Sequence, residues 1–184
     1  MGILLAVIAV FGVAGVSMYN SLVRRRNMVD QSYATIDVQL TQRYDLIPKL
    51  VETVKQYMTH ERSLLEEIVR LRSRAVQSTT PGDRIRADNE LSGALSRLNV
   101  TMENYPQLRS SENFVQLQRS LNEVEEQLAA ARRTYNAAVT DYNNAVQTFP
   151  SSMIAGSTGF GLRQMFAADS QKRGDVDMKG LFKA

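Results

Sequence analysis

His60 and Glu61 come nearest to a catalytic motif in this sequence, because His-Glu opens the helical HExxH signature of zinc proteases. That signature needs a second histidine one turn later, but the sequence continues Arg62-Ser63-Leu64 and contains no other histidine. The 184 residues also include no cysteine, which removes thiolate metal ligands, a cysteine nucleophile and disulfides. We therefore predict no catalytic, cofactor-binding or metal-ligating residues, and a protein that is not an enzyme.

Phosphate and nucleic-acid chemistry are also missing from the sequence. Gly156, Gly159 and Gly161 follow a predicted helix and no Gly-Lys-Ser/Thr comes after them, so they do not form a phosphate-binding loop. The 22 Lys and Arg against 19 Asp and Glu give a net charge of +3, with the two signs mixed along the chain. A nucleic-acid binder would gather its basic residues on one face, so we expect no nucleic-acid partner.

The Arg24, Arg25 and Arg26 cluster could bind anionic lipid headgroups, at about 1 kcal/mol for each arginine. It follows 21 uncharged residues, 3–23, which as a helix would cover roughly 30 Å, the thickness of a bilayer's hydrocarbon core. Tyr19 lies near the expected interface, where belts of aromatic residues occur. The sequence thus predicts a membrane span over residues 1–23, with these four residues at the interface.

Three other interpretations of the N-terminal segment fit less well. A secretory signal needs a basic start, which Met1-Gly2-Ile3 lacks. Myristoylation needs Ser or Thr where Ala6 stands. A buried core helix that is apolar on all sides for five turns is rare in so small a domain. Since positive residues stay on the cytoplasmic side, we expect the N-terminus outside and residues 24–184 in the cytoplasm.

Beyond the span, apolar residues recur at helical spacing and would form one stripe along a helix, which we call a seam. Steps of three and four residues from Tyr33 meet thirteen positions, of which eleven are apolar, and the phase is constant to Ala75. We therefore expect one helix from about Tyr19 to Ser78, reaching roughly 90 Å beyond the span. Pro48 within it favours a kink over a loop that begins at Asp45. The seam positions that we assign to packing or assembly are Tyr33, Ile36, Leu40, Arg43, Ile47, Leu50 and Glu61, together with the adjoining Pro48.

Arg43 and Glu61 are the two charged positions of that seam. They could be buried partners that fix the register of the helices, as polar seam residues do in coiled coils. They could equally lie at the edge of the seam and extend to water. Their separation of 18 residues, about 27 Å along one helix, prevents them from pairing with each other.

Two further helices are expected after the turn residues Gln77–Asp83. The second runs from Asp83 to Asn104 before Pro106, and the third begins after Ser110 or Ser111 and stops at Phe149. Along the third helix every seam position is apolar or aromatic, and its buried tyrosines need hydroxyl partners. The large seam residues assigned to packing or assembly are Leu121, Leu128, Tyr135, Tyr142 and Phe149.

These elements predict an all-α fold in which an N-terminal transmembrane helix continues into a long-helix antiparallel bundle with coiled-coil-like packing. The expected units are the span at 1–23, a cytoplasmic bundle at 24–150 and a C-terminal tail at 151–184. A short helix is expected from Leu162 to Ala168 within the tail.

The segment Tyr19–Glu61 strongly resembles the LemA family of bacterial membrane proteins, and looser similarity extends to Phe149-Pro150. The matching residues include Tyr19-Asn20, Leu22-Val23, Arg26-Asn27, Ile36-Asp37-Val38-Gln39-Leu40, Arg43, Asp45-Leu46-Ile47-Pro48, Leu50-Val51, Val54-Lys55, Tyr57 and His60-Glu61. The resemblance implies one N-terminal span in the bacterial inner membrane, an outward N-terminus, a cytoplasmic helical bundle and no enzyme activity. It also implies that some relatives help to form internal membranes and that others accompany membrane proteases.

Two functions therefore remain open. One is a membrane-anchored scaffold that forms homo-oligomers and organises or shapes the membrane, because confinement to a bilayer raises the local concentration of neighbours. The alternative is a tethered adaptor that docks a protein client such as a membrane protease. Both need the lipid bilayer as a partner, and neither needs a cofactor.

Overall fold

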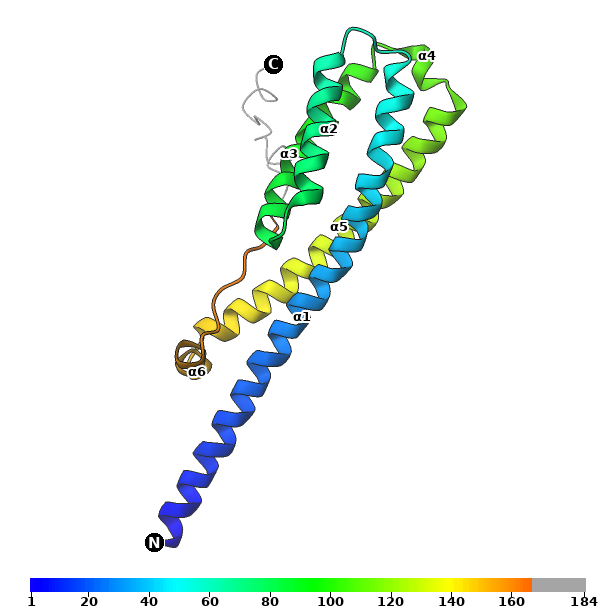
Figure 1. Cartoon of the computed structure of the whole chain (residues 1–184). Coiled ribbons are helices and arrows are strands. Elements are labelled where there is room, and N and C mark those ends of the chain that lie inside the picture. Colours follow the sequence, from blue (N-terminus) through cyan, green and yellow to red (C-terminus); the bar gives the residue numbers. More distant parts are fainter. Residues whose placement is uncertain (167–184) are drawn as a thin grey trace, which may run out of the picture.

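The computed structural model describes residues 1–166, and these residues form helices without a strand (Figure 1). The all-α prediction is therefore confirmed, as is a bundle that carries a long apolar N-terminal helix. Within the described residues the helices are α1 (Gly2–Lys55), α2 (Arg62–Gln77), α3 (Pro81–Met102), α4 (Pro106–Arg109), α5 (Glu112–Gln147) and α6 (Ser151–Thr158).

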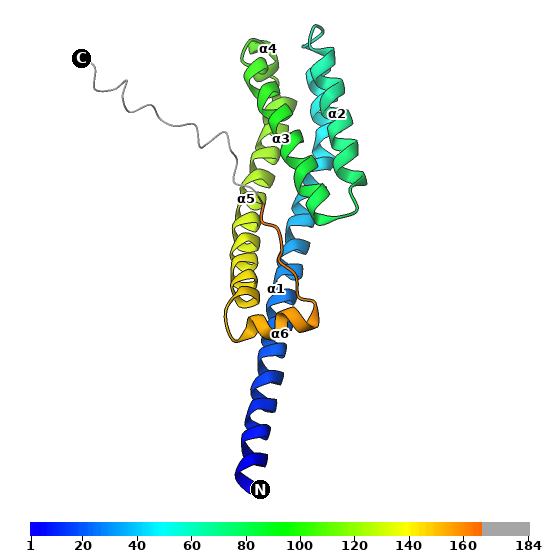
Figure 2. The same cartoon turned by 90° about the vertical axis from the view of Figure 1, so that its left-hand side faces the viewer.

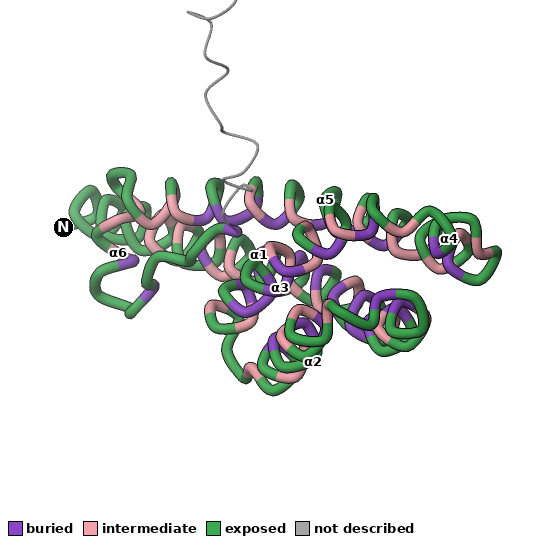
Figure 3. The backbone as a smooth tube through the Cα atoms, turned by 90° about the horizontal axis from the view of Figure 1, so that it is seen from above, coloured by how far each residue is buried: buried purple, intermediate pink, exposed green. Residues whose placement is uncertain are grey.

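The bundle is built on the antiparallel pair α1 and α5, which make the most extensive contact in the fold. The helices α2 and α3 form a hairpin against the far part of α1, and α6 lies across α1 near the base of the bundle (Figures 1 and 2). The N-terminal turns of α1 project beyond everything else. Their residues are exposed, whereas buried residues lie where the helices face one another (Figure 3).

The prediction of one helix from Tyr19 to Ser78 is wrong. The helix α1 ends at Lys55, and α2 runs back along it after a turn at residues 56–61 (Figure 1). Met58 in this turn is only 1% exposed, so the turn itself contributes to the core. The six-residue turn keeps the apolar stripes of both helices in phase, which is why periodicity alone could not distinguish a reversal from a continuous rod.

Pro48 lies inside α1 without breaking it, so the alternative of a loop at this point is wrong. Proline has no amide hydrogen, and it therefore leaves the carbonyl of residue 44, four positions earlier, without its helical donor. In the structure Arg72 Nε of α2 donates to this Tyr44 carbonyl at 3.2 Å. The gap that proline leaves in α1 is thus filled by a side chain of the returning helix.

The seam of the third predicted helix is largely confirmed in α5. Its buried members include Leu128, Tyr135 and Tyr142, whereas Leu121 is half-buried. Phe149 is 76% exposed and takes no part in the core of this chain. On α1, the seam positions Ile36, Leu40, Arg43, Ile47 and Leu50 are all buried, and Tyr33 is half-buried. The prediction of a helix at Leu162–Ala168 is wrong for residues 162–166, which are not helical. Its last two residues, like the remainder of the tail to residue 184, lie outside the described residues.

A double-mutant cycle tests the contact between Pro48 and Arg72. We expect Arg72→Ala to lower the unfolding free energy by about 1 kcal/mol in the natural chain, since a carbonyl loses its donor. In a Pro48→Ala background the amide of residue 48 supplies that donor, so Arg72→Ala should cost clearly less. Denaturant unfolding followed by helical circular dichroism measures both values, and equal costs in the two backgrounds would contradict the contact.

Candidate functional site

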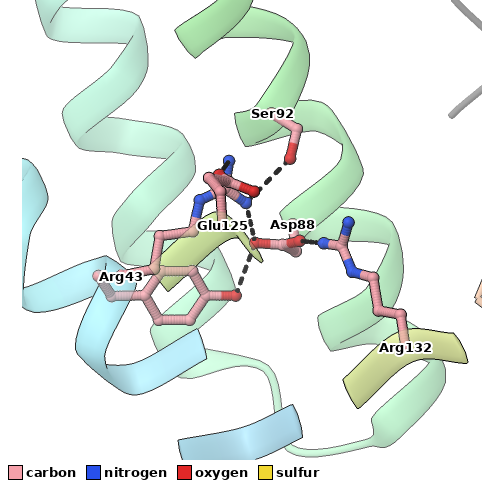
Figure 4. A network of polar contacts seen from close by, with 6 residues as sticks. Arg43, Asp88, Ser92, Glu125 and Arg132 are labelled. Atoms are coloured by element: carbon pink, nitrogen blue, oxygen red, sulfur yellow. Dashed lines mark hydrogen bonds and ion pairs between the residues drawn. The ribbon is translucent and has the colours of Figure 1, made fainter. Parts of the chain in front are cut away.

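The first unusual feature is a set of charged side chains inside the bundle, which we call the ionic cluster (Figure 4). It joins Arg43 of α1, Asp88 of α3, and Glu125 and Arg132 of α5. Arg43 is 3% exposed and Asp88 is fully buried. Two cations and two carboxylates leave the cluster neutral, which is the condition under which charges are tolerated in an interior.

Hydrogen bonds orient the two arginines and Asp88, and Glu125 joins the cluster through an ion pair. The Arg43 guanidinium donates to Asp88 Oδ1 and to the Ser92 hydroxyl, both at 2.9 Å, and its second terminal nitrogen lies 2.6 Å from Glu125. On the other side of Asp88, Oδ2 accepts from Arg132. The carboxylate of Asp88 thus bridges arginines that come from α1 and α5 (Figure 4).

Tyr44 adds a neutral donor to the cluster. Its hydroxyl donates to Asp88 Oδ1 at 3.3 Å. Burial, reinforced by the negative charge of Asp88, raises the pKa of the Tyr44 hydroxyl well above its usual value, so it stays protonated and remains a donor.

The ionic cluster links α3 to the α1–α5 pair. The backbone of α3 packs chiefly on α2, so long side chains make much of its link to α1 and α5. Its start is set locally, because Thr80 accepts from the Asp83 amide and donates to the Asp83 carboxylate, with Pro81 in the first turn. The ionic cluster then orients the buried face of α3 towards the other two helices.

The sequence indicated only part of this cluster. Of the two alternatives for Arg43, the buried one is correct. Glu61 is half-buried in the turn before α2, away from any seam of α1. Asp88, Glu125 and Arg132 were missed, although a signal existed: Asp88 lies three residues before Leu91, on the buried face of α3.

We expect Asp88→Ala to lower the free energy of unfolding by about 3–5 kcal/mol, because it leaves two arginines without their shared carboxylate. The matched control is Glu90→Ala, also on α3. Its exposed pair with Arg74 should contribute about 0.2–1 kcal/mol. Thermal unfolding of both variants measures the difference, and similar losses would show that the cluster does not hold α3 in place.

The second feature is the segment Phe160–Phe166, which we call the strap. It leaves α6 and runs along α5 in an extended path, with its backbone held by side chains of α5. The Tyr142 and Tyr135 hydroxyls donate to the carbonyls of Gly161 and Gln164, both at 2.9 Å.

The asparagine that follows each of these tyrosines binds both the backbone amide and the backbone carbonyl of one strap residue. Asn143 donates to the Arg163 carbonyl and accepts from the Arg163 amide, each at 2.9 Å. Asn136 makes the same pair with Phe166, at 3.1 and 2.9 Å. The extended backbone therefore has side-chain partners where a neighbouring strand would otherwise be needed.

The repeat in this arrangement follows from geometry. Two Tyr-Asn pairs seven residues apart on α5 are separated by about 10.5 Å of helical rise. Three residues of extended chain cover about 10 Å. The pair at 142–143 therefore meets residues 161 and 163, and the pair at 135–136 meets residues 164 and 166, in the same relative positions.

Both ends of the strap are fixed by aromatic contacts. Phe160 follows Gly159, which ends α6 in the left-handed conformation (φ 77°). The ring of Phe160 lies 5.8 Å from that of Tyr19 and 5.2 Å from the Arg26 guanidinium carbon. At the other end, the Phe166 ring lies 5.3 Å from the guanidinium carbon of Arg132, which links the strap to the ionic cluster.

The prediction that Tyr135 and Tyr142 need hydroxyl partners is confirmed, and their partners are backbone carbonyls. Burial raises the pKa of both hydroxyls above the usual value, which keeps them protonated as donors. Asn136 and Asn143 were missed, although their repetition directly after the seam tyrosines was visible in the sequence.

We expect Asn143→Ala to increase hydrogen exchange at the Arg163 and Phe166 amides while the helices of the bundle stay protected. The Arg163 amide loses its acceptor and the strap loses one of its paired contacts, which should cost about 1–3 kcal/mol locally. Asn144→Ala is the control, because that side chain is exposed on the same turn. If the two variants exchange alike at these amides, Asn143 does not hold the strap.

The third feature is the base of the bundle, where α1 leaves it. None of the most apolar window of α1 is buried in the bundle, and by length and composition this helix could cross a membrane. Arg25 donates to the Asp141 carbonyl at 3.3 Å, Arg26 lies against Phe160, and Arg24 is exposed. A polar cavity of about 460 Å³ lies here, lined by residues that include Met18, Leu22, Arg25, Pro150 and Ser151.

Among the described residues, no three His, Asp or Glu side chains gather in a way that could hold a metal ion. His60 is exposed in the turn between α1 and α2. The polar groups that the fold does bring together, the ionic cluster and the strap contacts, join helices and backbone to one another.

A helical bundle with an unburied apolar helix at its N-terminus is typical of membrane-associated proteins of the all-α class. Comparison with known families matches residues 32–179 to the LemA family. The match covers most of the chain, and the protein belongs to the LemA family.

Individual relatives agree with this assignment. Protein LemA of Metamycoplasma hominis is 25% identical over 178 residues, which cover 95% of this chain and 80% of the relative. Magnetosome protein MamQ 2 of Paramagnetospirillum magneticum is 35% identical over 80 residues, and MamQ of Magnetospirillum gryphiswaldense is 34% identical over 74. These matches cover 29% and 27% of the magnetosome proteins, so the chain spans less than a third of their length.

Proposed function

We propose that this protein is a non-enzymatic, membrane-anchored scaffold that self-assembles on the bacterial inner membrane. The observation that carries the proposal is the N-terminal part of α1. It is apolar, outside the bundle, and continuous with a helix whose next turns belong to the core. One rigid helix would therefore hold the bundle directly at the membrane surface, without a flexible linker.

The distribution of charge supports the proposed orientation. Arg24, Arg25 and Arg26 stand at the exit of the span, which favours an outward N-terminus and a cytoplasmic bundle. Arg24, which is exposed, is the arginine best placed to contact anionic lipid headgroups.

Three observations support self-assembly: confinement of the chain to a bilayer, exposed apolar side chains on the bundle, and similarity to related proteins. The seam of α1 is covered by α5, so it leaves no open apolar stripe on which a second chain could pack. Confinement to the bilayer still raises the effective concentration of neighbours. Apolar side chains also remain exposed beyond the span, among them Met28 at 56% and Val38 at 55%. Over 80 residues the chain is similar to a magnetosome protein, and the family resemblance implies relatives that help to form internal membranes.

An adaptor is the second candidate, and one observation favours it. At the far end of the bundle, a groove of about 510 Å³ lies between the end of α1 and α2, with mainly apolar lining. Val51, Met58, Leu65 and Val69 contribute to it. A client that binds this end would be held at a distance from the membrane by the length of the α1–α5 pair.

Light scattering on the full-length chain in mild detergent distinguishes the two functions. For a scaffold we expect discrete particles whose protein mass is a multiple of the 20.6 kDa chain at micromolar concentration. The reason is that lateral contacts between anchored bundles remain when the bilayer is replaced. A monomer across the whole concentration range would contradict self-assembly and leave the adaptor as the better candidate.

The orientation is tested in sealed inner-membrane vesicles of both polarities. The chain has no cysteine, so Val100→Cys places a single thiol on the far end of α3, where residue 100 is 65% exposed. An impermeant maleimide should react with it in inside-out vesicles and not in right-side-out ones. The reverse pattern would contradict the proposed topology.

A further inference from the structure

The segment that contains α6 carries no charge and exposes large apolar side chains. The run from Tyr142 to Leu162 contains no charged residue. Within it Phe149 is 76% exposed, Met153 is 68% exposed and Leu162 is 57% exposed. We call these three residues the basal patch. All three lie on or next to α6, and exposed apolar residues that gather in one region mark a surface that contacts a partner or a membrane.

The position of α6 relative to α1 indicates what covers the basal patch. Pro150 and Ser151 line the same cavity as Met18 and Leu22, which belong to the last turns of the uncharged stretch of α1. At the other end of α6, Phe160 contacts Tyr19 and Arg26. The short helix therefore lies across α1 at the level where the apolar segment ends (Figure 2).

This is the level at which the proposed span would place the membrane interface. The basal patch lies at the level where the apolar segment of α1 ends, and the arginines 24–26 follow that segment directly. Aromatic and other amphipathic side chains accumulate at this depth of a bilayer. The groove at the opposite end of the bundle is not near the apolar segment of α1, because the length of the α1–α5 pair separates the two.

We propose that α6 and its flanking residues form a second membrane contact, which lies in the plane of the interface. Phe149 and Met153 enter the boundary between headgroups and acyl chains, at a depth of about 5–10 Å. The inference rests on the anchoring proposed above, since it needs α1 to span the bilayer. The strap and the Phe160 contacts would hold α6 at this depth, so the bundle would meet the lipid at two points.

Depth-dependent quenching of tryptophan fluorescence tests the proposal directly. The chain contains no tryptophan, so single substitutions report from one place each. Phe149→Trp and Met153→Trp probe the basal patch. Phe11→Trp probes the middle of the span, and Val100→Trp probes the far end of the bundle. Each full-length variant is reconstituted into vesicles whose lipids carry bromine either near the headgroup (shallow) or near the end of the acyl chain (deep). Circular dichroism verifies that each variant is folded.

We expect Trp emission at 149 and 153 to be lost most strongly with the shallow bromines, that at 11 with the deep bromines, and that at 100 with neither. If position 11 is quenched while 149 and 153 are not, the second contact is wrong and the anchor stands. Blue-shifted but unquenched emission at 149 would show that another protein chain covers the patch, which also overturns the proposal. If position 11 is not quenched, both the anchor and the inference fail.

Discussion

The structure depends on one buried carboxylate. Asp88 is fully buried, and it receives hydrogen bonds from Arg43 of α1, Tyr44 of α1 and Arg132 of α5. Without it, two guanidinium groups would remain in or near the interior without their shared counter-charge, which is costlier than never having buried them. Since α3 otherwise packs chiefly on α2, this carboxylate fixes how the α2–α3 hairpin sits on the α1–α5 pair.

The same cluster reaches the base of the bundle through Arg132. Its guanidinium binds Asp88 and also lies against the ring of Phe166, the last described residue of the strap. From there the Tyr-Asn pairs of α5 bind the strap backbone at four residues, and Phe160 at its other end contacts Tyr19 beside the apolar segment of α1. A continuous set of contacts thus joins the interior of the bundle to the point where α1 leaves it, which is how a short helix such as α6 can keep a defined place.

The sequence was most informative where side chains repeat along one element. The α5 seam and the buried positions of α1 are set by the period of the helix, and both could be predicted. The reversal after Lys55 could not, because no glycine or proline marks it and its length keeps the apolar stripe in phase. The partners of Arg43 could not be predicted either, since Asp88 and Glu125 are distant in sequence and meet only after α3 and α5 have packed. The strap was out of reach for the same reason, although the Tyr-Asn repeat that binds it was present on α5.

A second membrane contact would change what the anchor does. One span alone fixes the distance of a bundle from the bilayer but leaves it free to rotate about the helix axis and to tilt within the lipid. Contact through α6 on one side of α1 removes part of that freedom, because rotation about α1 is coupled to the lipid surface. Anchored bundles would then present the same lateral faces to their neighbours. Each bundle would then lose its rotational entropy when it inserts into the membrane, and not when it meets another bundle. This favours ordered assembly over random clustering. In this way the strap contacts bear on whether a scaffold of these bundles is regular.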